Sequence, residues 1–221
     1  MRFFLDMCII LYYIGEGDST NLINKSKSFV KNKKSNKFII CKYILEIDIP
    51  KWIKRQKIIF RELIRYVNSK GYILYTSDES KELTKRDKTK IQKLIYLYKN
   101  SKDKKEFINK MNKIQLYYRL AIDDFILKQI DEMIISPKDI DSELKSHLRS
   151  FINIGQSNKN ESDTNIIASA IQGHNEKPLI IFTADKKDIN DELIEEVHYH
   201  TTLPKKYPKL PSVQYLQNYT C

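Results

Sequence analysis

The sequence predicts an α/β fold in which a mostly parallel central sheet lies between two layers of helices. Two short apolar runs, at 2–6 and 178–185, each end in an aspartate. Such runs between turn signals are typical of strands that are covered on both faces. The second run follows a helical pattern at 162–170, and a helix that feeds a buried strand is half of an α/β unit. Because such folds hold their ligands beyond the carboxyl ends of the strands, we expect the functional site there.

Length and composition are those of one ordinary domain. The chain has 221 residues, of which 41% are hydrophobic, so it can bury a core. Only five glycines and six prolines argue against a loop-rich or disordered chain. We therefore expect a single domain over residues 1–221, with a Lys-rich helical insertion at 68–132.

Hydrophobic spacing and turn residues place the other elements. Further strands are expected at 38–41, 72–75, 133–137, 197–200 and 213–216, the last two at sheet edges. Helices are expected at 7–14, 19–34, 52–67 and 140–151, with two or three more between 79 and 134 and a polar loop at 156–161. Gly15 and Gly17 end the first helix, and Pro50 suits the first turn of the helix at 52–67.

Three acidic residues are expected at one edge of the sheet. Asp6 and Asp185 end strands, and Asp163 opens the helix that precedes the second of these strands. Crowded carboxylates are costly without a cation, and hard oxygen ligands select Mg²⁺ or Mn²⁺. The pattern therefore predicts a metal-dependent phosphoryl-transfer site, with Thr183 supporting Asp185 and with Asp188 as a reserve ligand.

Each acid also has an ordinary structural interpretation. Asp163 follows Ser162 before an apolar helix, which is common N-terminal capping chemistry. Asp6 can simply end a strand, and Asp185 can open a turn with Lys186 and Lys187. The shared placement at element ends favours the functional interpretation.

The positive charge fits a polyanionic partner. The formal net charge is +11 and the sequence pI is about 9.3, and Lys and Arg gain by releasing counterions from phosphates. A helical stretch with Lys85, Arg86 and nearby tyrosines can line an RNA path, or it can be a solvated helix face with its tyrosines in the core. Lys186 and Lys187 add positive charge beside the expected site.

Other kinds of site have weaker support. Cys8, Cys41 and Cys221 are too few and too scattered for a disulfide framework or a zinc motif, which favours a reducing compartment. His198 and His200 form a surface pair rather than a zinc site. No phosphate-binding glycine loop is present in the sequence. Without a secretory signal or an apolar run long enough to span a membrane, we expect a cytoplasmic protein.

These features resemble those of the PIN-domain nucleases. The matching parts are the opening strand that ends in Asp6, a strand followed by 43–46, the Asp163 helix with small residues at 168–170, and the strand end at 183–185. The resemblance implies a compact parallel sheet with an acidic cluster that holds Mg²⁺ or Mn²⁺ and hydrolyses RNA. It adds Glu46 as a fourth acid.

The chain departs from the family pattern at two places. Met7 stands where the family usually has a small hydroxyl residue after the first aspartate, which weakens the turn that supports Asp6. The stretch 68–132 has no counterpart in small family members.

Three functions follow from the sequence. The first is a Mg²⁺- or Mn²⁺-dependent endoribonuclease, either the toxin of a toxin–antitoxin pair or an RNA-processing enzyme. The second is a catalytically silent module that binds RNA or a protein partner, and the third is a small-molecule enzyme or receiver-like domain on an α/β scaffold. RNA is the expected partner, with an antitoxin or other inhibitor and a homodimer as further candidates.

Overall fold

The computed structural model describes residues 1–17, 19–69, 75, 77–152 and 161–220. The chain divides into two compact units. The first comprises Met1–Asp48 and Asp124–Cys221 and is called the α/β unit below. The second comprises Ile49–Asp123 and is called the helical unit.

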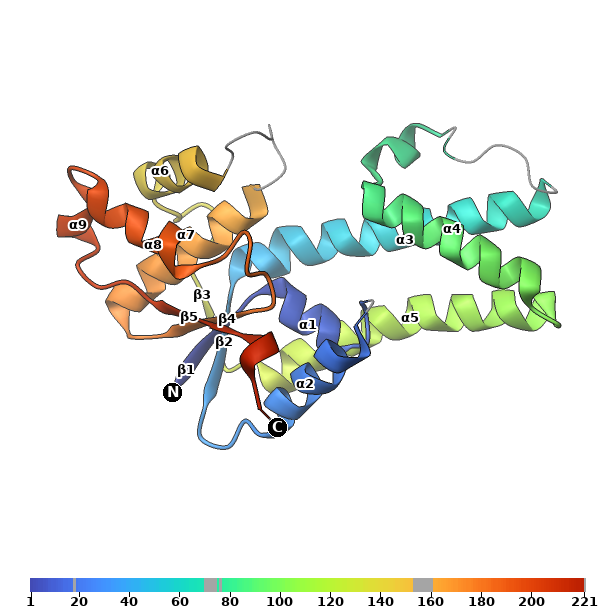
Figure 1. Ribbon diagram of the computed structural model, residues 1–221, viewed down its shortest axis with the longest axis horizontal. Helices are drawn as coiled ribbons and strands as arrows, with labels where there is room; N and C mark the ends of the chain where they lie inside the picture. The colour runs from blue at the N-terminus through green and yellow to red at the C-terminus, as the bar shows by residue number, and fades with distance from the viewer. Residues whose placement is uncertain (18, 70–74, 76, 153–160, 221) are drawn as a thin grey trace. The chain divides into compact units, whose positions relative to one another are not determined.

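The α/β unit is built on a parallel sheet (Figure 1). Among the residues that the structure describes, five strands pair in the order β3-β2-β1-β4-β5, and each pair is parallel. The strands are β1 Arg2–Leu5, β2 Lys37–Cys41, β3 Glu132–Ile134, β4 Ile180–Thr183 and β5 Ser212–Tyr215. The expected α/β fold is confirmed, and the strand expected at 213–216 lies at the sheet edge as β5.

Helices make up most of the remaining described chain. The α/β unit contains α1 Met7–Tyr13, α2 Thr20–Lys31, α6 Ser142–Ile152, α7 Glu161–Glu176, α8 Asp191–Glu195 and α9 Leu203–Lys206. The helical unit contains α3 Ile49–Asn68, α4 Lys85–Asn100 and most of α5 Lys104–Gln129. Short turns of helix are η1 Ile44–Asp48, η2 Asp78–Glu82, η3 Glu196–Tyr199 and η4 Leu216–Asn218.

Helices cover the two faces of the sheet. On one face, Phe29 of α2 stacks on Phe182 of β4, with ring centroids 3.9 Å apart. On the other face lies α7, where a Cβ at Gly173 would collide with Cδ1 of Ile134 of β3. The α7 backbone thus comes so close to the sheet that a side chain at this position would have to push the end of the Ile134 side chain aside. The result is a layer of helix on each side of the strands.

The strand order creates a switch point between β1 and β4. From β1 the chain builds outward through β2 and β3 on one side, and through β4 and β5 on the other. In parallel sheets a ligand crevice forms at this point, beyond the carboxyl ends of the strands. The C-terminus of α7 leads into the start of β4, so α7 runs antiparallel to the strands. Its N-terminus therefore lies at the carboxyl ends of the strands. The fold therefore brings Asp6, Asp163 and Asp185 to one edge.

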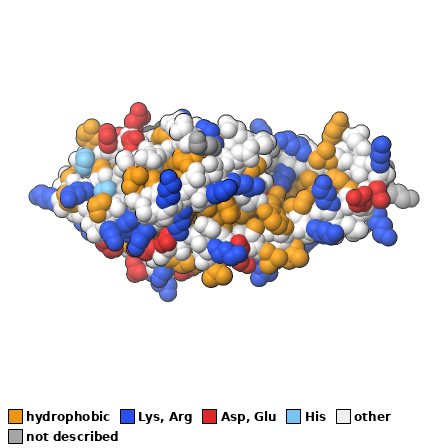
Figure 2. Space-filling model, turned by 90° about the horizontal axis from the view of Figure 1, so that it is seen from below, with side chains coloured by type: hydrophobic (Ala, Val, Ile, Leu, Met, Phe, Trp, Pro, Cys, Tyr) orange, Lys and Arg blue, Asp and Glu red, His pale blue; other side chains and the backbone are white. Residues whose placement is uncertain are grey.

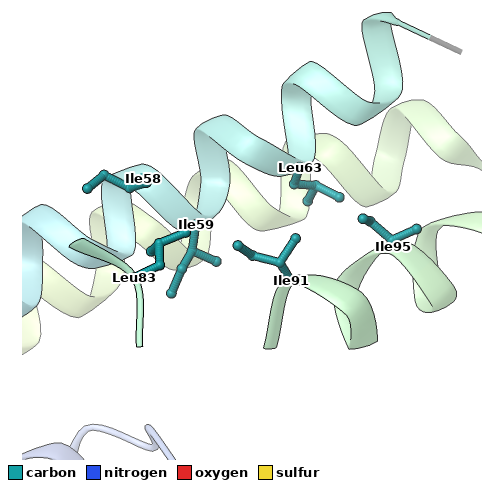
Figure 3. Close-up of a cluster of buried hydrophobic side chains, with 6 residues drawn as sticks. All are labelled: Ile58, Ile59, Leu63, Leu83, Ile91 and Ile95. Atoms are coloured by element: carbon teal, nitrogen blue, oxygen red, sulfur yellow. The ribbon is translucent and has the colours of Figure 1, made fainter. Parts of the chain in front are cut away.

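The helical unit has its own apolar core. Ile59 and Leu63 of α3 pack against Ile91 and Ile95 of α4, together with Ile58 and Leu83 (Figure 3). Phe107, Ile108 and Met111 of α5 cover this cluster. The helical unit of 49–123 thus begins earlier than the stretch 68–132 expected from the sequence, because α3 contributes its buried face to this core.

One expected strand is wrong. The segment 197–200 is expected at a sheet edge, but α8 continues directly into the 3-10 turn Glu196–Tyr199. Ile194 and Val197 are both buried, and this three-residue spacing suits a helical turn rather than a strand. Of the other expectations, residues 72–74 and 156–160 lie outside the described residues, and Tyr75 is not in a strand.

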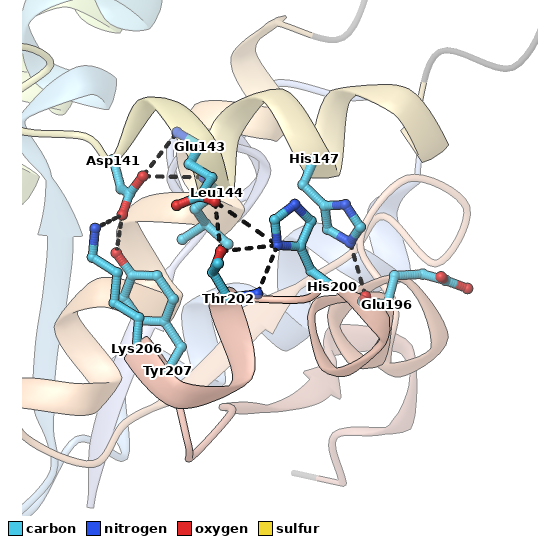
Figure 4. Close-up of polar contacts among 9 residues, drawn as sticks. All are labelled: Asp141, Glu143, Leu144, His147, Glu196, His200, Thr202, Lys206 and Tyr207. Atoms are coloured by element: carbon cyan, nitrogen blue, oxygen red, sulfur yellow. Dashed lines mark hydrogen bonds and ion pairs between the residues drawn. The ribbon is translucent and has the colours of Figure 1, made fainter.

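Polar contacts fasten α6 to the C-terminal part of the α/β unit (Figure 4). Asp141 accepts hydrogen bonds from the backbone N–H groups of Glu143 and Leu144, which caps α6, and from the Tyr207 hydroxyl at 2.6 Å. It also pairs with Lys206. Burial opposes the charge of Asp141, but these donors outweigh it and lower its pKa to about 2. Of the two histidines expected at the surface, His198 is exposed, and His200 lies against His147, with ring centroids 4.7 Å apart.

Candidate functional site

The site begins with Thr183, which joins the ends of β1 and β4. Its Oγ1 donates a hydrogen bond to Oδ2 of Asp6 at 2.7 Å and accepts one from the backbone N–H of Asp185 at 2.9 Å. Both Asp6 and Thr183 are buried. The predicted supporting position of Thr183 therefore has a structural basis, but its direct partners are the carboxylate of Asp6 and the backbone of Asp185.

Cys8 is a second support for Asp6, and its role was not predicted from the sequence. Its Sγ donates to Oδ2 of Asp6 at 2.7 Å and accepts from the backbone N–H of Ala184 at 3.2 Å. Burial and the neighbouring Asp6 charge raise the pKa of the Cys8 thiol well above its usual value, so it stays protonated and donates. The thiol thus supports the Asp6 carboxylate from the residue that follows Met7. A cysteine in the first turn of α1, two residues after the strand-end aspartate, was the available signal.

Asp163 lies in the first turn of α7 and is surrounded by like charges. Burial raises its pKa to about 8, and the charges of Asp6, Asp188, Asp185 and Asp48 contribute in that order. A helix N-terminus normally favours an ionised carboxylate, so burial and like charge outweigh the helix here. We call these five residues the acidic cluster: Asp6, Asp48, Asp163, Asp185 and Asp188.

Asp185 shapes the turn that follows β4. Its Oδ1 accepts hydrogen bonds from the backbone N–H groups of Lys187 and Asp188, both at 3.0 Å. The ordinary interpretation of Asp185 as a turn residue therefore holds for one oxygen, while Oδ2 accepts no hydrogen bond from a described residue. The turn brings Asp188 back toward the site, where burial and then the Asp185 charge raise its pKa against the effect of Lys187.

The fourth acid of the site is Asp48 rather than Glu46. Glu46 is exposed on the π-helical turn Ile44–Asp48. Asp48, two residues later, is buried and accepts a hydrogen bond from the Ser162 hydroxyl at 2.6 Å. An aspartate directly before a helix with proline in its first turn could have indicated this residue.

The donor set of the acidic cluster suits a hard divalent cation. Asp6, Asp163, Asp185 and Asp188 form no ion pair with any lysine or arginine in the described part of the chain. Carboxylate oxygens are the ligands of Mg²⁺ and Mn²⁺. As the side chains stand, no three His, Cys, Asp or Glu residues among those described are arranged to hold one ion.

The basic residues singled out in the sequence fall in both units. Lys186 and Lys187 are exposed next to Asp185, and Lys186 lies 5.2 Å from the centre of the Tyr215 ring. Lys85 and Arg86 are exposed at the start of α4 in the helical unit.

No protein-family model matches the chain, and comparisons with curated proteins and with solved structures find no significant match. The resemblance to the PIN-domain nucleases therefore depends on the residues of this sequence alone. Within the described ranges, every helix is too short or too polar to cross a bilayer.

Proposed function

We propose that this protein is a PIN-like endoribonuclease that depends on Mg²⁺ or Mn²⁺ and hydrolyses RNA phosphodiester bonds. The observation that carries this proposal is the acidic cluster at the switch point between β1 and β4. A fold gains nothing in stability from collecting carboxylates without basic partners. Such an arrangement is typical of a functional site whose charge is balanced by a ligand.

Asp6, Asp163 and Asp185 are the residues that would hold the ion, with Asp48 and Asp188 beside them. The bound ion would supply a more acidic water and would neutralise charge that develops on the phosphate. Thr183 and Cys8 keep Oδ2 of Asp6 fixed, which leaves Oδ1 as the oxygen available to a ligand.

Asp163 holds a proton near neutral pH in the metal-free protein, because its pKa is about 8. Ligand carboxylates must be ionised, so cation binding at this residue releases a proton and becomes tighter as the pH rises.

The distribution of charge supports RNA as the substrate. Residues 49–123 contain 20 Lys and Arg against 8 Asp and Glu, a net charge of +12, whereas the rest of the chain has 19 against 20. The positive excess of the protein therefore lies in the helical unit, and the acids of the site lie in the other unit. This separation suits a chain that binds an RNA backbone with one unit and cuts it with the other.

A catalytically silent RNA-binding module is the second candidate. It is favoured by the basic helical unit together with the absence, among the described residues, of three side chains already arranged around one ion. The two candidates differ in whether a divalent cation leads to strand cleavage.

The decisive experiment is cleavage of labelled RNAs by purified protein in Mn²⁺, in Mg²⁺ and in EDTA. Metal-dependent products are expected for the wild type, and a loss of at least about 100-fold is expected for Asp6→Asn and Asp185→Asn, on the scale of other electrostatic catalytic groups. Binding without cleavage by the wild type would select the silent module. Cleavage that survives both substitutions would refute the acidic site.

Asp48→Asn and Glu46→Gln form a matched pair in the same assay. We expect Asp48→Asn to lose activity, because its carboxylate is part of the acidic cluster, and Glu46→Gln to retain it, because Glu46 is exposed. The reverse result would return the role of fourth acid to Glu46.

A further inference from the structure

A pocket of about 210 Å³ lies within the helical unit, where side chains of α3 and α5 meet. Its lining combines aromatic, amide and basic side chains. Those that carry the argument are Trp52, Gln56, Lys57, Leu116, Tyr118 and Arg119. The acidic cluster contributes nothing to this lining.

Two aromatic rings form one side of the pocket. The rings of Trp52 and Tyr118 meet edge to face, with centroids 5.7 Å apart and planes at 60°. Lys90 places its Nζ 5.6 Å from the centre of the Tyr118 ring and donates to Oε1 of Gln56 at 2.9 Å. Lys90 therefore contacts both Tyr118 and Gln56, which supports the position of these two side chains.

The buried amide of Gln56 offers a polar contact. Gln56 is only 4% exposed, and its Nε2 donates to no described residue. With Oε1 engaged by Lys90, the amide nitrogen is the group left for a hydrogen-bond acceptor in the pocket.

The mouth of the pocket is basic. Lys57 and Arg119 are exposed and form no ion pair with any residue in the described ranges. They belong to a unit whose net charge is +12. Figure 2 shows hydrophobic side chains interspersed with Lys and Arg over one face of the molecule. Exposed Leu116, Tyr117 and Leu120 of α5 are among the apolar residues of the helical unit.

We propose that this pocket binds an unpaired nucleobase of single-stranded RNA. The base stacks on Tyr118 and its edge lies against the largely buried Trp52. That edge accepts a hydrogen bond from Gln56, and Lys57 and Arg119 contact the adjoining phosphates. Single-stranded RNA is bound in this way, with bases on aromatic rings and phosphates on basic side chains. This inference rests on the proposed function because it takes RNA as the ligand. It extends that function by requiring the RNA to be single-stranded where it enters the pocket.

The first test measures binding by the full chain in EDTA, so that no cleavage is needed. Trp52 is the only tryptophan, so its fluorescence reports on the pocket directly. A short single-stranded RNA is expected to change this emission on saturation, whereas an abasic oligonucleotide with the same phosphates is expected to leave it unchanged. Equal affinity for both oligonucleotides, or no change of emission with RNA, would overturn the proposal.

The second test uses neighbouring tyrosines of α5. Tyr118→Leu should weaken RNA binding about tenfold, the scale of one stacked base, with no effect on the abasic oligonucleotide. Tyr118→Phe should retain the affinity because the ring remains. Tyr117→Leu is the matched control, since Tyr117 is 54% exposed and does not line the pocket. Equal losses of affinity for Tyr117→Leu and Tyr118→Leu would refute the pocket. The abasic oligonucleotide is the folding control, because a misfolded Tyr118→Leu protein would lose affinity for it as well.

The pocket and the proposed nuclease activity can fail separately. Asp6→Asn should keep the preference for the base-containing oligonucleotide over the abasic one, because Asp6 is not part of the pocket. Stacking-dependent binding without cleavage supports the pocket and contradicts the nuclease. Metal-dependent cleavage, together with equal binding of the base-containing and abasic oligonucleotides, contradicts the pocket but not the nuclease activity.

Discussion

At the scale of single residues, Asp6 shows how the site is supported. Its Oδ2 receives hydrogen bonds from Thr183 and Cys8, two side chains from opposite ends of the chain. Burial raises the pKa of Asp6, these two hydrogen bonds lower it, and the charge of Asp185 raises it again. The pKa of Asp6 is nevertheless raised overall, so the two hydrogen bonds oppose the effect of burial without cancelling it.

Asp163 makes a prediction about stability and pH. Its folded pKa is about 8, compared with 3.8 for an ordinary aspartate. The folded state thus holds an extra proton between these values, and wild-type stability falls as the pH rises from about 4 to about 8. Asp163→Asn does not titrate, so it should be more stable than the wild type at pH 8.5 by several kcal/mol, at about 1.4 kcal/mol per pKa unit. The difference should disappear near pH 4.

Urea unfolding in EDTA at pH 4, 6 and 8.5 measures this effect. Glu161→Gln is the control, because Glu161 is an exposed acid in the same helical turn. A gain that is the same at all three pH values would show that the raised pKa of Asp163, from burial and from the neighbouring carboxylates, is not its cause.

At the scale of elements, the packing of α7 on the sheet depends on Gly173. An added methyl group there would collide with Cδ1 of Ile134. Gly173→Ala should therefore destabilise the protein by about 1–3 kcal/mol, the usual cost of overpacking, although alanine favours helix by about 1 kcal/mol over glycine.

Ile134→Val removes the colliding carbon atom. In this background Gly173→Ala should cost less than in the wild type, because the next nearest atoms lie at 3.5 Å and 3.6 Å. Thermal or urea unfolding of the four proteins completes the cycle. Additive effects of the two substitutions would mean that the collision does not control the packing of α7.

At the scale of the whole molecule, charge is divided between the two units. The helical unit has a net charge of +12 and the remaining chain −1. RNA affinity should therefore fall steeply as the salt concentration rises. Replacing Lys57 and Arg119 with alanine should reduce the slope of log K against log [salt] by about 1.4, because each phosphate contact on a single strand contributes roughly 0.7.

A salt titration of binding in EDTA measures the slope. Lys27→Ala with Lys31→Ala is the matched control, since both residues are exposed on α2 of the α/β unit. We expect this pair to leave the slope unchanged. An equal reduction by both pairs would mean that binding follows total charge rather than the helical unit.

The sequence by itself determined the fold class, most elements and four of the five acids in the cluster. Apolar runs that end in aspartate, such as 2–6 and 178–185, indicate buried parallel strands. They can be recognised from the sequence because the pattern involves only neighbouring residues. Asp6 and Asp185 were found in this way. Asp163 was found as the opening residue of the helical pattern before the second run, and Asp188 as a reserve ligand shortly after Asp185. The strand expected at 197–200 failed because apolar residues three apart suit a helical turn better.

Only the tertiary structure decided which side chains support and complete the site. Whether Glu46 or Asp48 turns inward depends on the π-helical turn between β2 and α3, which no local pattern marks. Cys8 and Thr183 lie 175 residues apart and meet on one carboxylate because β1 pairs with β4. Strand order and the pocket between α3 and α5 are likewise set by packing between distant segments, and sequence spacing carries no direct record of such contacts.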